Sequence, residues 1–313
     1  MKQRNIKDYA LLTTKGLAMG AADVVPGVSG GTVAFVTGIY DELLGSLKKL
    51  GPSIIPMLFK QGIKATWQHI NGNFLLAVFG GILLSLKTFA SLISFALAHH
   101  PILVWAFFSG LIIASIRLLF NQQPKWQIKQ YLSMLLGIII VYFISVSTPA
   151  QLPSDGWFLF LGGFIAICAM ILPGISGSFI LLLMGLYPVF LDAIKSIDII
   201  ALASFGGGCI CGLLVFSRFL SWLLAKYEQT TIAVLIGFLI GSLNVTWPWK
   251  QTVSTYINRH GDELPLIRAN VNPNDFEMLT QVNPQLTLAV IVCLSGIALV
   301  IGLEFLATKF KQN

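Results

Sequence analysis

A short break rich in proline, glycine and serine occurs twice in the sequence, each time inside a long apolar stretch. The first copy reads AADVVPGVSGGTVAFVTGIY and the second reads CAMILPGISGSFILLLMGLY, so that 147 positions separate Pro26 from Pro173. Such a break ends one helix and begins another, and the new helix presents free backbone N–H groups. Glycine lets a ligand approach that backbone, and hydroxyls add donors. The two breaks therefore predict cradles for an anion.

The candidate binding residues are those of the two breaks themselves. They are Pro26, Gly27, Ser29, Gly30, Gly31 and Thr32 in the first copy, and Pro173, Gly174, Ser176, Gly177 and Ser178 in the second. The alternative is that these residues only interrupt helices and allow close packing, as glycine and serine often do in membrane bundles. Packing would explain a single copy, whereas two matched copies favour a substrate site built from discontinuous helices.

Among the charged residues within apolar stretches, where a charge is expensive and indicates function, four are candidates. We expect Lys87 to face a polar cavity. Arg117 and Arg218 lie near the ends of their stretches, and two interpretations stay open for them, phosphate binding and extension of the guanidinium to lipid headgroups. Asp23 has three interpretations: a coupling site for a proton or cation, a partner for a nearby lysine, or a helix cap.

The composition predicts a polytopic membrane protein. Of 313 residues, 56% are hydrophobic and 11% are charged, and apolar runs of spanning length recur along the chain. The net charge of +7 is explained by cytoplasmic loops beside anionic lipid, without a nucleic-acid partner. The four cysteines lie in apolar segments, so we expect no metal site and no disulfide framework.

Eight apolar units follow one another along the chain, and they fall into two similar halves. They cover residues 11–47, 74–97, 102–120 and 131–147 in the first half (1–148), and 157–194, 199–224, 231–247 and 286–307 in the second (149–313). The units 11–47 and 157–194 are long enough for a re-entrant hairpin of two half-helices, since one crossing needs only about 20 residues. Each half is therefore predicted to hold one re-entrant hairpin and three transmembrane helices.

The placement of lysine and arginine decides between parallel and inverted halves. If the first hairpin returns to its own side, the basic residues before and after it share one face, as the positive-inside rule requires. These residues are Lys2, Arg4, Lys7, Lys15, Lys48, Lys49, Lys60 and Lys64. Three crossings per half then make the fold an all-α pair of inverted repeats with both termini cytoplasmic. The breaks should approach each other near the bilayer midplane.

Two further features belong to the ends of the spans. The long loop 250–284 is predicted to be external, and the only role we suggest for it is a cap over the external entrance. Six tryptophans near predicted span ends indicate an interfacial belt. They are Trp105, Trp126, Trp157, Trp222, Trp247 and Trp249.

The segments GAADVVPGVSGGTVAFVTGIYDELL and AMILPGISGSFILLLMGLY resemble the bacterial polyprenyl-phosphate transporter family, over essentially the whole chain. The resemblance implies a multi-pass protein of the cytoplasmic (inner) membrane that moves undecaprenyl phosphate from the outer to the inner leaflet, for reuse in cell-envelope synthesis. It implies no enzymatic activity and no cofactor. By motif match it assigns function to Pro26, Gly27, Ser29, Gly30, Pro173, Gly174, Ser176 and Gly177. The second break ends Gly-Ser where the first ends Gly-Gly, so the two cradles need not be equivalent.

The physics of the substrate agrees with this resemblance. A monophosphate head must cross hydrocarbon while its apolar tail stays in lipid, so the protein needs to shield only the head. We expect the phosphate to bind between Ser29 and Ser176, helped by Lys87 and one arginine. The partners are then undecaprenyl phosphate and the phospholipid bilayer.

Two other functions remain as alternatives. A polyprenyl-diphosphate phosphatase would also surround an anionic lipid, but it needs an acid or base and usually a metal, and Asp23 is the only such residue in either break. A small-anion channel or transporter would use the same backbone N–H groups. The sequence leaves open the driving force, including coupling to a proton or sodium gradient, and the oligomeric state.

Overall fold

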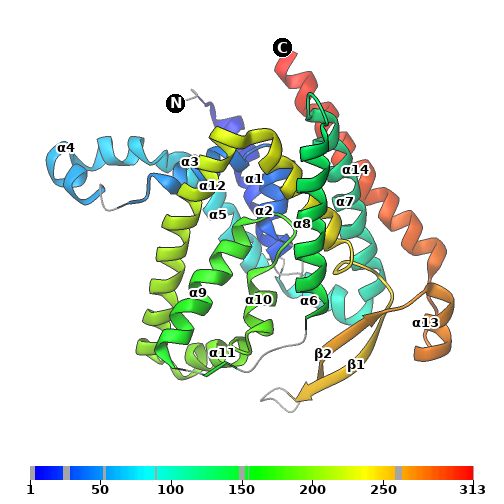
Figure 1. Ribbon diagram of the computed structural model, residues 1–313. Coiled ribbons are helices and arrows are strands. Elements are labelled where there is room, and N and C mark those ends of the chain that lie inside the picture. Colours follow the sequence, from blue (N-terminus) through cyan, green and yellow to red (C-terminus); the bar gives the residue numbers. More distant parts are fainter. Residues whose placement is uncertain are drawn as a thin grey trace.

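The computed structural model describes residues 4–23, 29–51, 54–88, 90–147, 152–153, 155–257 and 263–312, and this part of the chain is mostly helical (Figure 1). The first half contains α1 (Ile6–Asp23), α2 (Gly30–Val36), α3 (Tyr40–Lys48), α4 (Ile54–His69), α5 (Gly72–Thr88), α6 (Ala90–His99), α7 (Pro101–Gln122) and α8 (Ile128–Val146). The second half contains α9 (Gly156–Ile171), α10 (Gly177–Leu183), α11 (Tyr187–Ser196), α12 (Ile199–Ser242), β1 (Lys250–Ile257), β2 (Glu263–Asn270), α13 (Pro273–Thr280) and α14 (Leu286–Gln312).

The two proline-glycine breaks fold in the same way. Helices α2 and α10 each have seven residues, and both ends of α10 lie 147 positions after those of α2. Each is followed by a glycine with a φ angle of 70°, Gly38 or Gly185, which a residue with a side chain adopts at a cost. Helix α2 packs back against α1, and α10 against α9. The repeat seen in the sequence is therefore a repeat of local structure.

Several helices are long and apolar enough to cross a membrane. In the described residues, the segments Pro101–Asn121, Ile128–Val146 and Ile199–Thr246 meet this criterion, and shorter apolar helices cover Gly72–Ser85, Gly156–Ile171 and Leu286–Gly302. Helix α12 contains a non-helical residue, Tyr227, and Figure 1 shows the helix bending over at the end of the molecule that carries both termini. The stretches 199–224 and 231–247 are thus the two arms of one bent helix.

The expected span 74–97 is divided in the structure into α5 and α6. The hydroxyl of Thr88 donates a hydrogen bond of 2.7 Å to the carbonyl of Leu84 near the end of α5. Bonds of this kind to the preceding turn bend helices. The residue between the two helices, Phe89, lies outside the described residues.

Small residues let the helices pack closely in equivalent places of the two halves. A Cβ added at Gly16 would lie 2.2 Å from the carbonyl oxygen of Val78, in the contact of α1 with α5. In the contact of α9 with α12, a Cβ at Gly163 would lie 2.2 Å from the carbonyl oxygen of Phe205. Such close backbone approach is typical of helix pairs in membranes.

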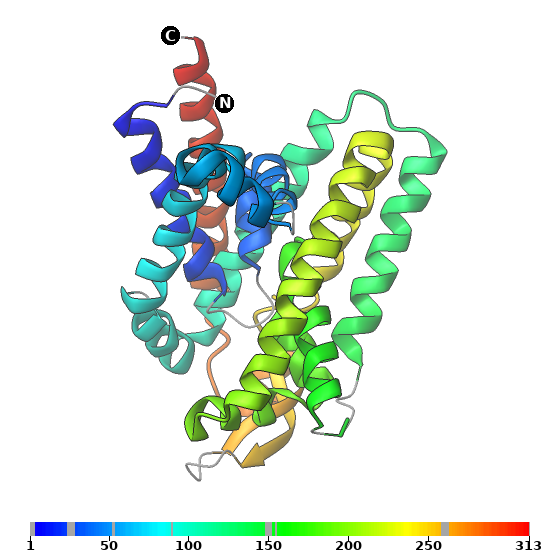
Figure 2. The same ribbon diagram turned by 90° about the vertical axis from the view of Figure 1, so that its left-hand side faces the viewer.

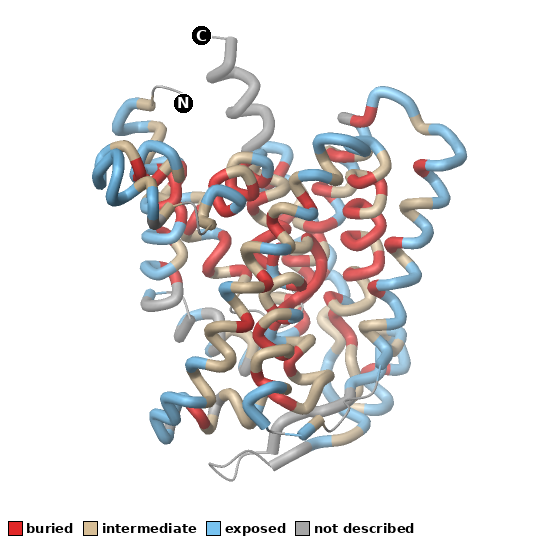
Figure 3. Tube along the Cα trace, turned by 60° about the vertical axis from the view of Figure 1, so that its left-hand side comes forward, coloured by how far each residue is buried: buried red, intermediate tan, exposed pale blue. Residues whose placement is uncertain are grey.

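The halves also interlock, because α7 packs against α14 and α8 packs against α12. Figure 2 shows the two termini near each other at one end of the molecule. Buried residues gather between the helices and exposed ones cover the outside in Figure 3. Many exposed side chains of α8 are large and apolar, among them Leu132, Leu135, Leu136, Ile139 and Phe143. An apolar surface of this extent suits contact with lipid.

The expectation of an all-α chain needs one correction, in the region 250–284. Strands β1 and β2 form an antiparallel pair there, followed by the short helix α13. The segment KQTVSTYI is rich in β-branched and aromatic residues, which favour strands, so it forms β1 where the sequence predicted a loop. This β-hairpin extension lies at the end of the molecule opposite the termini (Figure 1). It is anchored by an apolar cluster that joins Trp249 and Phe276 to Ile102 and Ala106 of α7 and Ala289 of α14.

Candidate functional site

The first break is stabilised by side chains from its own copy of the motif. Ser29 is the N-cap of α2, and its hydroxyl oxygen accepts a hydrogen bond of 3.1 Å from the backbone N–H of Gly31. The carboxylate of Asp23, at the end of α1, accepts one of 2.7 Å from the N–H of Gly30. Of the three roles expected for Asp23, capping is the one that this contact supports. Pro26 and Gly27 lie outside the described residues.

The two breaks contact each other directly, although they are far apart in the sequence. The Ser29 hydroxyl donates a hydrogen bond of 2.8 Å to the carbonyl of Met170, near the end of α9. In return, the backbone N–H of Gly174 donates one of 2.9 Å to the Thr32 hydroxyl oxygen. Ser29 is 1% exposed and Thr32 is 6% exposed. In both bonds a side chain of the first break thus pairs with a backbone group of the second break, which would otherwise lack a partner inside the apolar bundle.

Two glycines are required at this contact by the space that is left. A Cβ at Gly31 would lie 2.6 Å from the carbonyl oxygen of Ile171, and backbone atoms cannot yield as a flexible side chain can. Gly174 has a φ angle of +85°, and a Cβ there would lie 2.7 Å from the carbonyl oxygen of Phe238 in α12. The glycines therefore have a packing role in addition to the binding role expected for them.

The second break is also largely buried. Pro173 and Gly177 are buried, and Ser176, the N-cap of α10, is 5% exposed. The Ser176 hydroxyl lies 2.9 Å from that of Ser178, and Ser178 is exposed. The pair thus joins a buried hydroxyl of the second break to an exposed one in the first turn of α10.

The charged candidates lie in different surroundings. Arg117 of α7 is exposed, and the Arg218 guanidinium donates a hydrogen bond of 2.6 Å to the Leu214 carbonyl in its own helix. No contact of the described residues joins either arginine to a break. Lys87 belongs to α5, and its side chain lies outside the described part of the structure. The substrate contacts of these three residues stay predictions. In the described residues, no three His, Cys, Asp or Glu side chains are placed to hold a metal.

Tyr40 is a residue of the site that the sequence analysis did not select. It is buried at 2% exposure, and its hydroxyl donates a hydrogen bond of 2.9 Å to the carbonyl of Ile171. The available signal was its place in the repeat, since Gly38 and Tyr40 of the first copy match Gly185 and Tyr187 of the second. The hydroxyls of Tyr40 and Ser29 thus each donate a hydrogen bond to a backbone carbonyl at the end of α9.

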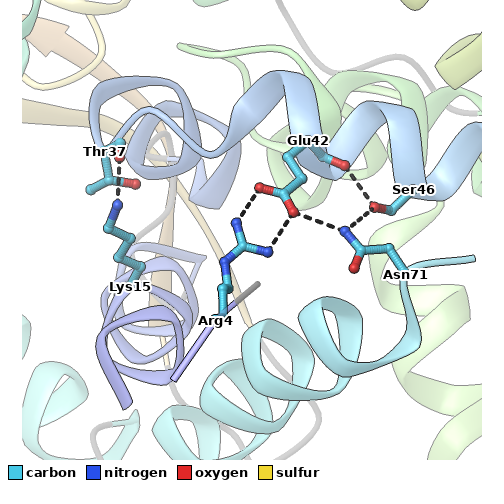
Figure 4. Close-up of polar contacts among 6 residues, drawn as sticks. All are labelled: Arg4, Lys15, Thr37, Glu42, Ser46 and Asn71. Carbon is cyan, nitrogen blue, oxygen red and sulfur yellow. Dashed lines mark hydrogen bonds and ion pairs between the residues drawn. The ribbon is translucent and has the colours of Figure 1, made fainter. Parts of the chain in front are cut away.

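A second polar cluster fixes the first hairpin at the end of the molecule that carries the termini (Figure 4). The Arg4 guanidinium binds both carboxylate oxygens of Glu42 in α3, at 2.7 and 2.5 Å, and this bond raises the pKa of Arg4 above its usual value. The Asn71 amide donates a further hydrogen bond of 2.8 Å to Glu42. The Lys15 ammonium donates one of 2.7 Å to the Thr37 carbonyl. These contacts join the N-terminus and α5 to the hairpin.

Fold and site together define a helical membrane protein in which two matched broken helices, one from each half, meet in the interior. This arrangement is typical of membrane transporters. The family model described as VCA0040-like, undecaprenyl phosphate translocase-like, matches residues 19–264, and the chain belongs to this family.

Two relatives have similar sequences over most of their length. A polyprenyl-phosphate transporter of Vibrio cholerae serotype O1 is 47% identical over 302 residues, which are 96% of this chain and 98% of the relative. A polyprenyl-phosphate transporter of Staphylococcus aureus is 31% identical over 256 residues, which are 76% of this chain and 86% of the relative. Both names describe transporters and not enzymes. No solved structure matches the chain.

Proposed function

We propose that this protein moves undecaprenyl phosphate from the outer to the inner leaflet of the bacterial cytoplasmic membrane, so that the lipid can be reused in cell-envelope synthesis. Its family and the names of its two relatives support transport of a polyprenyl phosphate. The observation that supports a phosphate site at the breaks is their buried contact. It consists of the hydrogen bonds of Ser29 with Met170 and of Thr32 with Gly174.

We infer that the phosphate binds where the breaks meet. Hydroxyls and backbone N–H groups gather there, and they can replace the water that a phosphate loses in hydrocarbon. In the structure the Ser29 hydroxyl already donates its hydrogen bond to the Met170 carbonyl. Ser29, Thr32 and Ser176 are also buried away from solvent. A phosphate therefore reaches these groups only when the breaks move apart, as alternating access between two halves requires.

We also propose that the two halves are inverted repeats with both termini in the cytoplasm. The termini lie at one end of the molecule, α3 lies near that end, and α11 lies near the opposite end (Figure 1). One hairpin would then return to each side of the membrane. The basic residues flanking the first hairpin agree with a cytoplasmic position of the end that carries the termini.

Reconstitution tests this function. Proteoliposomes would carry a polyprenyl phosphate with a fluorescent tail label, and an impermeant reductant would bleach the label in the outer leaflet. We expect the protein to make the inner-leaflet pool bleachable, and the triple variant Ser29→Ala, Ser176→Ala, Lys87→Ala to slow this by about tenfold or more, the loss expected for one charged hydrogen bond. Unchanged translocation in the variant would refute the site.

The same vesicles separate the proposal from its two alternatives. Release of inorganic phosphate from a polyprenyl diphosphate would identify a phosphatase. Passage of chloride or inorganic phosphate without lipid translocation would identify a small-anion pathway. A dependence of the rate on an imposed proton or sodium gradient would identify the coupling ion, and Asp23→Asn would then test whether Asp23 carries it.

A further inference from the structure

Two cations of the β-hairpin extension lie close together at the end of the molecule opposite the termini. Lys250 pairs with Asn270, and Thr252 pairs with Arg268 in the ladder of β1 and β2. Side chains two positions apart on a strand share a face, so Lys250 and Arg268 are diagonal neighbours on one face, at about 7–8 Å between backbones. Like charges so placed repel each other.

The Lys250 side chain turns into the protein and not into water. Its ammonium lies 4.4 Å from the ring centroid of Trp105 in α7 and donates a hydrogen bond to the Val245 carbonyl. Burial, together with the charge of Arg268, lowers the pKa of Lys250 to about 7. Trp105 was expected in an interfacial belt, but it is buried at 4% exposure.

Neither cation has an acidic partner in the described part of the chain, where the ion pair formed is that of Arg4 with Glu42. Helix α13 packs against β1, and its acid Asp275 accepts a hydrogen bond from Asn272. An ammonium has three donors, and the Val245 carbonyl uses one of them. Two close cations with free donors are suited to hold a phosphate.

This cation pair also lies next to the first break. Trp105 belongs to an apolar cluster with Ala22, the residue before Asp23, and Val33 of α2 packs against the same cluster. Trp105 thus shares one apolar cluster with residues from both arms of the first break, and the Lys250 ammonium lies over the Trp105 ring. A ligand at Lys250 would therefore lie beside the apolar cluster that includes residues of both arms of the first break.

We propose that Lys250 and Arg268 form a capture site for the monophosphate head of the lipid, at the end of the protein opposite the termini, before the phosphate passes Trp105 to the two breaks. This inference rests on the proposed function and names a further part of the same path. The ligand class is a phosphate monoester with an apolar tail. The extension is then a binding element and not only a cap.

Binding to purified full-length protein in detergent tests the capture site. The probe is farnesyl phosphate, with farnesol as its uncharged analogue and inorganic phosphate as the free anion. We expect Lys250→Gln and Arg268→Gln each to weaken binding of farnesyl phosphate by about tenfold, the loss of one charge-assisted contact. Lys250→Arg should retain most of the affinity, and farnesol binding should not change in any variant.

Lys226→Gln is the matched control, because the Lys226 ammonium also lies over aromatic rings, 5.7 Å from that of Trp222 and 5.5 Å from that of Tyr227. The affinity of Lys226→Gln for farnesyl phosphate should equal that of the unaltered protein. Normal binding in folded Lys250→Gln and Arg268→Gln would overturn the capture site. Equal affinity for inorganic phosphate and farnesyl phosphate would overturn the lipid head as its ligand.

The proposed function and the capture site fail in distinguishable ways. If the unaltered protein does not translocate undecaprenyl phosphate in vesicles, the proposed function fails. If it does and the two variants translocate and bind normally, only the capture site fails. Should Lys250→Gln not fold, Arg268→Gln decides the question, because the Arg268 side chain is exposed and its loss leaves the apolar anchor of the extension intact.

Discussion

The backbone N–H of Gly174 donates a hydrogen bond of 2.9 Å to the hydroxyl oxygen of Thr32, 142 positions earlier in the chain. Both partners are buried, so neither has water as a substitute. The bond joins the second break to the first helix turn that follows the other break. Separation of the two breaks, which the proposed transport cycle needs, must break this bond and make another.

Thr32→Val should therefore destabilise the protein. Valine has nearly the shape of threonine but lacks the hydroxyl, so the Gly174 N–H would be buried without an acceptor, at a cost of about 1–3 kcal/mol. We expect a lower thermal unfolding midpoint in detergent and a changed rate of lipid translocation. Thr32→Ser keeps the acceptor and should stay close to the unaltered protein. Equal midpoints for the valine and serine variants would contradict the importance of this bond.

Gly31→Ala should force the two breaks apart. The added methyl group would lie 2.6 Å from the carbonyl oxygen of Ile171 and 2.8 Å from that of Met170, and overpacking of this kind costs about 1–3 kcal/mol. The expected result is a lower unfolding midpoint together with weaker translocation.

Gly45→Ala is the matched control for that variant. Gly45 lies in α3, and no atom lies within 4 Å of a Cβ added there. Alanine should stabilise the helix by up to about 1 kcal/mol, because glycine is the poorer helix former. If Gly31→Ala behaves like Gly45→Ala, the close contact between the breaks is not present in the membrane.

The sequence predicted the contact between the breaks because its cause is local and repeated. Pro26 and Pro173 mark the same interruption twice, and an interrupted helix in an apolar bundle must find partners for its free backbone groups. The polar, proline-rich composition of 250–284 predicts only a loop, although KQTVSTYI has the strand-forming residues that fold as β1.

The packing of Lys250 against Trp105 could not be predicted in this way. It joins residues 145 positions apart, and it depends on how the β-hairpin extension docks onto α7. The same holds for the hydrogen bond that the Tyr40 hydroxyl donates to the main-chain carbonyl of Ile171. Every residue has such a carbonyl, so the sequence does not show which one accepts the bond. Contacts to main-chain atoms across distant elements require the tertiary structure.

Lys250→Met should stabilise the protein at low pH. Burial and Arg268 lower the pKa of Lys250 to about 7, whereas its ordinary value is 10.5. Below pH 7 the folded state carries the full cost of the buried charge, and between pH 7 and 10.5 it releases the proton and the cost declines. Stability of the unaltered protein should therefore rise with pH across this window. At pH 6 the thermal unfolding midpoint of Lys250→Met should exceed that of the unaltered protein. The difference between the two midpoints should narrow by pH 9.

The groups around Lys250 sharpen this measurement. The Trp105 ring and the Val245 carbonyl are neutral, and Arg268 on β2 is the charge that acts on Lys250; Asp275 is the acid of α13, the helix that packs against β1. Since the charge of Arg268 lowers the pKa of Lys250, Arg268→Gln should move the rise in stability to higher pH. A difference between Lys250→Met and the unaltered protein that does not depend on pH would refute this account.

Glu42→Gln should loosen the first hairpin at the end that carries the termini. The variant loses the charge of the fork-like contact with Arg4, and a partly exposed pair of this kind contributes about 1 kcal/mol or less. Amide hydrogen exchange in α3 should become faster, with little change in α10. Arg4→Lys keeps the charge but not the two parallel bonds, so it should give an intermediate rate. Lys7→Gln, at an exposed lysine, should have no effect.

Single cysteines at Lys60 and Thr252, in a background without Cys168, Cys209, Cys211 and Cys293, should be labelled from opposite sides of the membrane. Lys60 and Thr252 are both exposed, and they belong to α4 and to the β-hairpin extension. Inverted halves with cytoplasmic termini require an impermeant thiol reagent added to whole cells to reach position 252 and not position 60. A cysteine at Lys125 should behave like that at Lys60, because the loop between α7 and α8 has the same predicted side. External labelling at Lys60 would exclude the inverted arrangement, and with it the opposite entry of the two hairpins on which the proposed phosphate path depends.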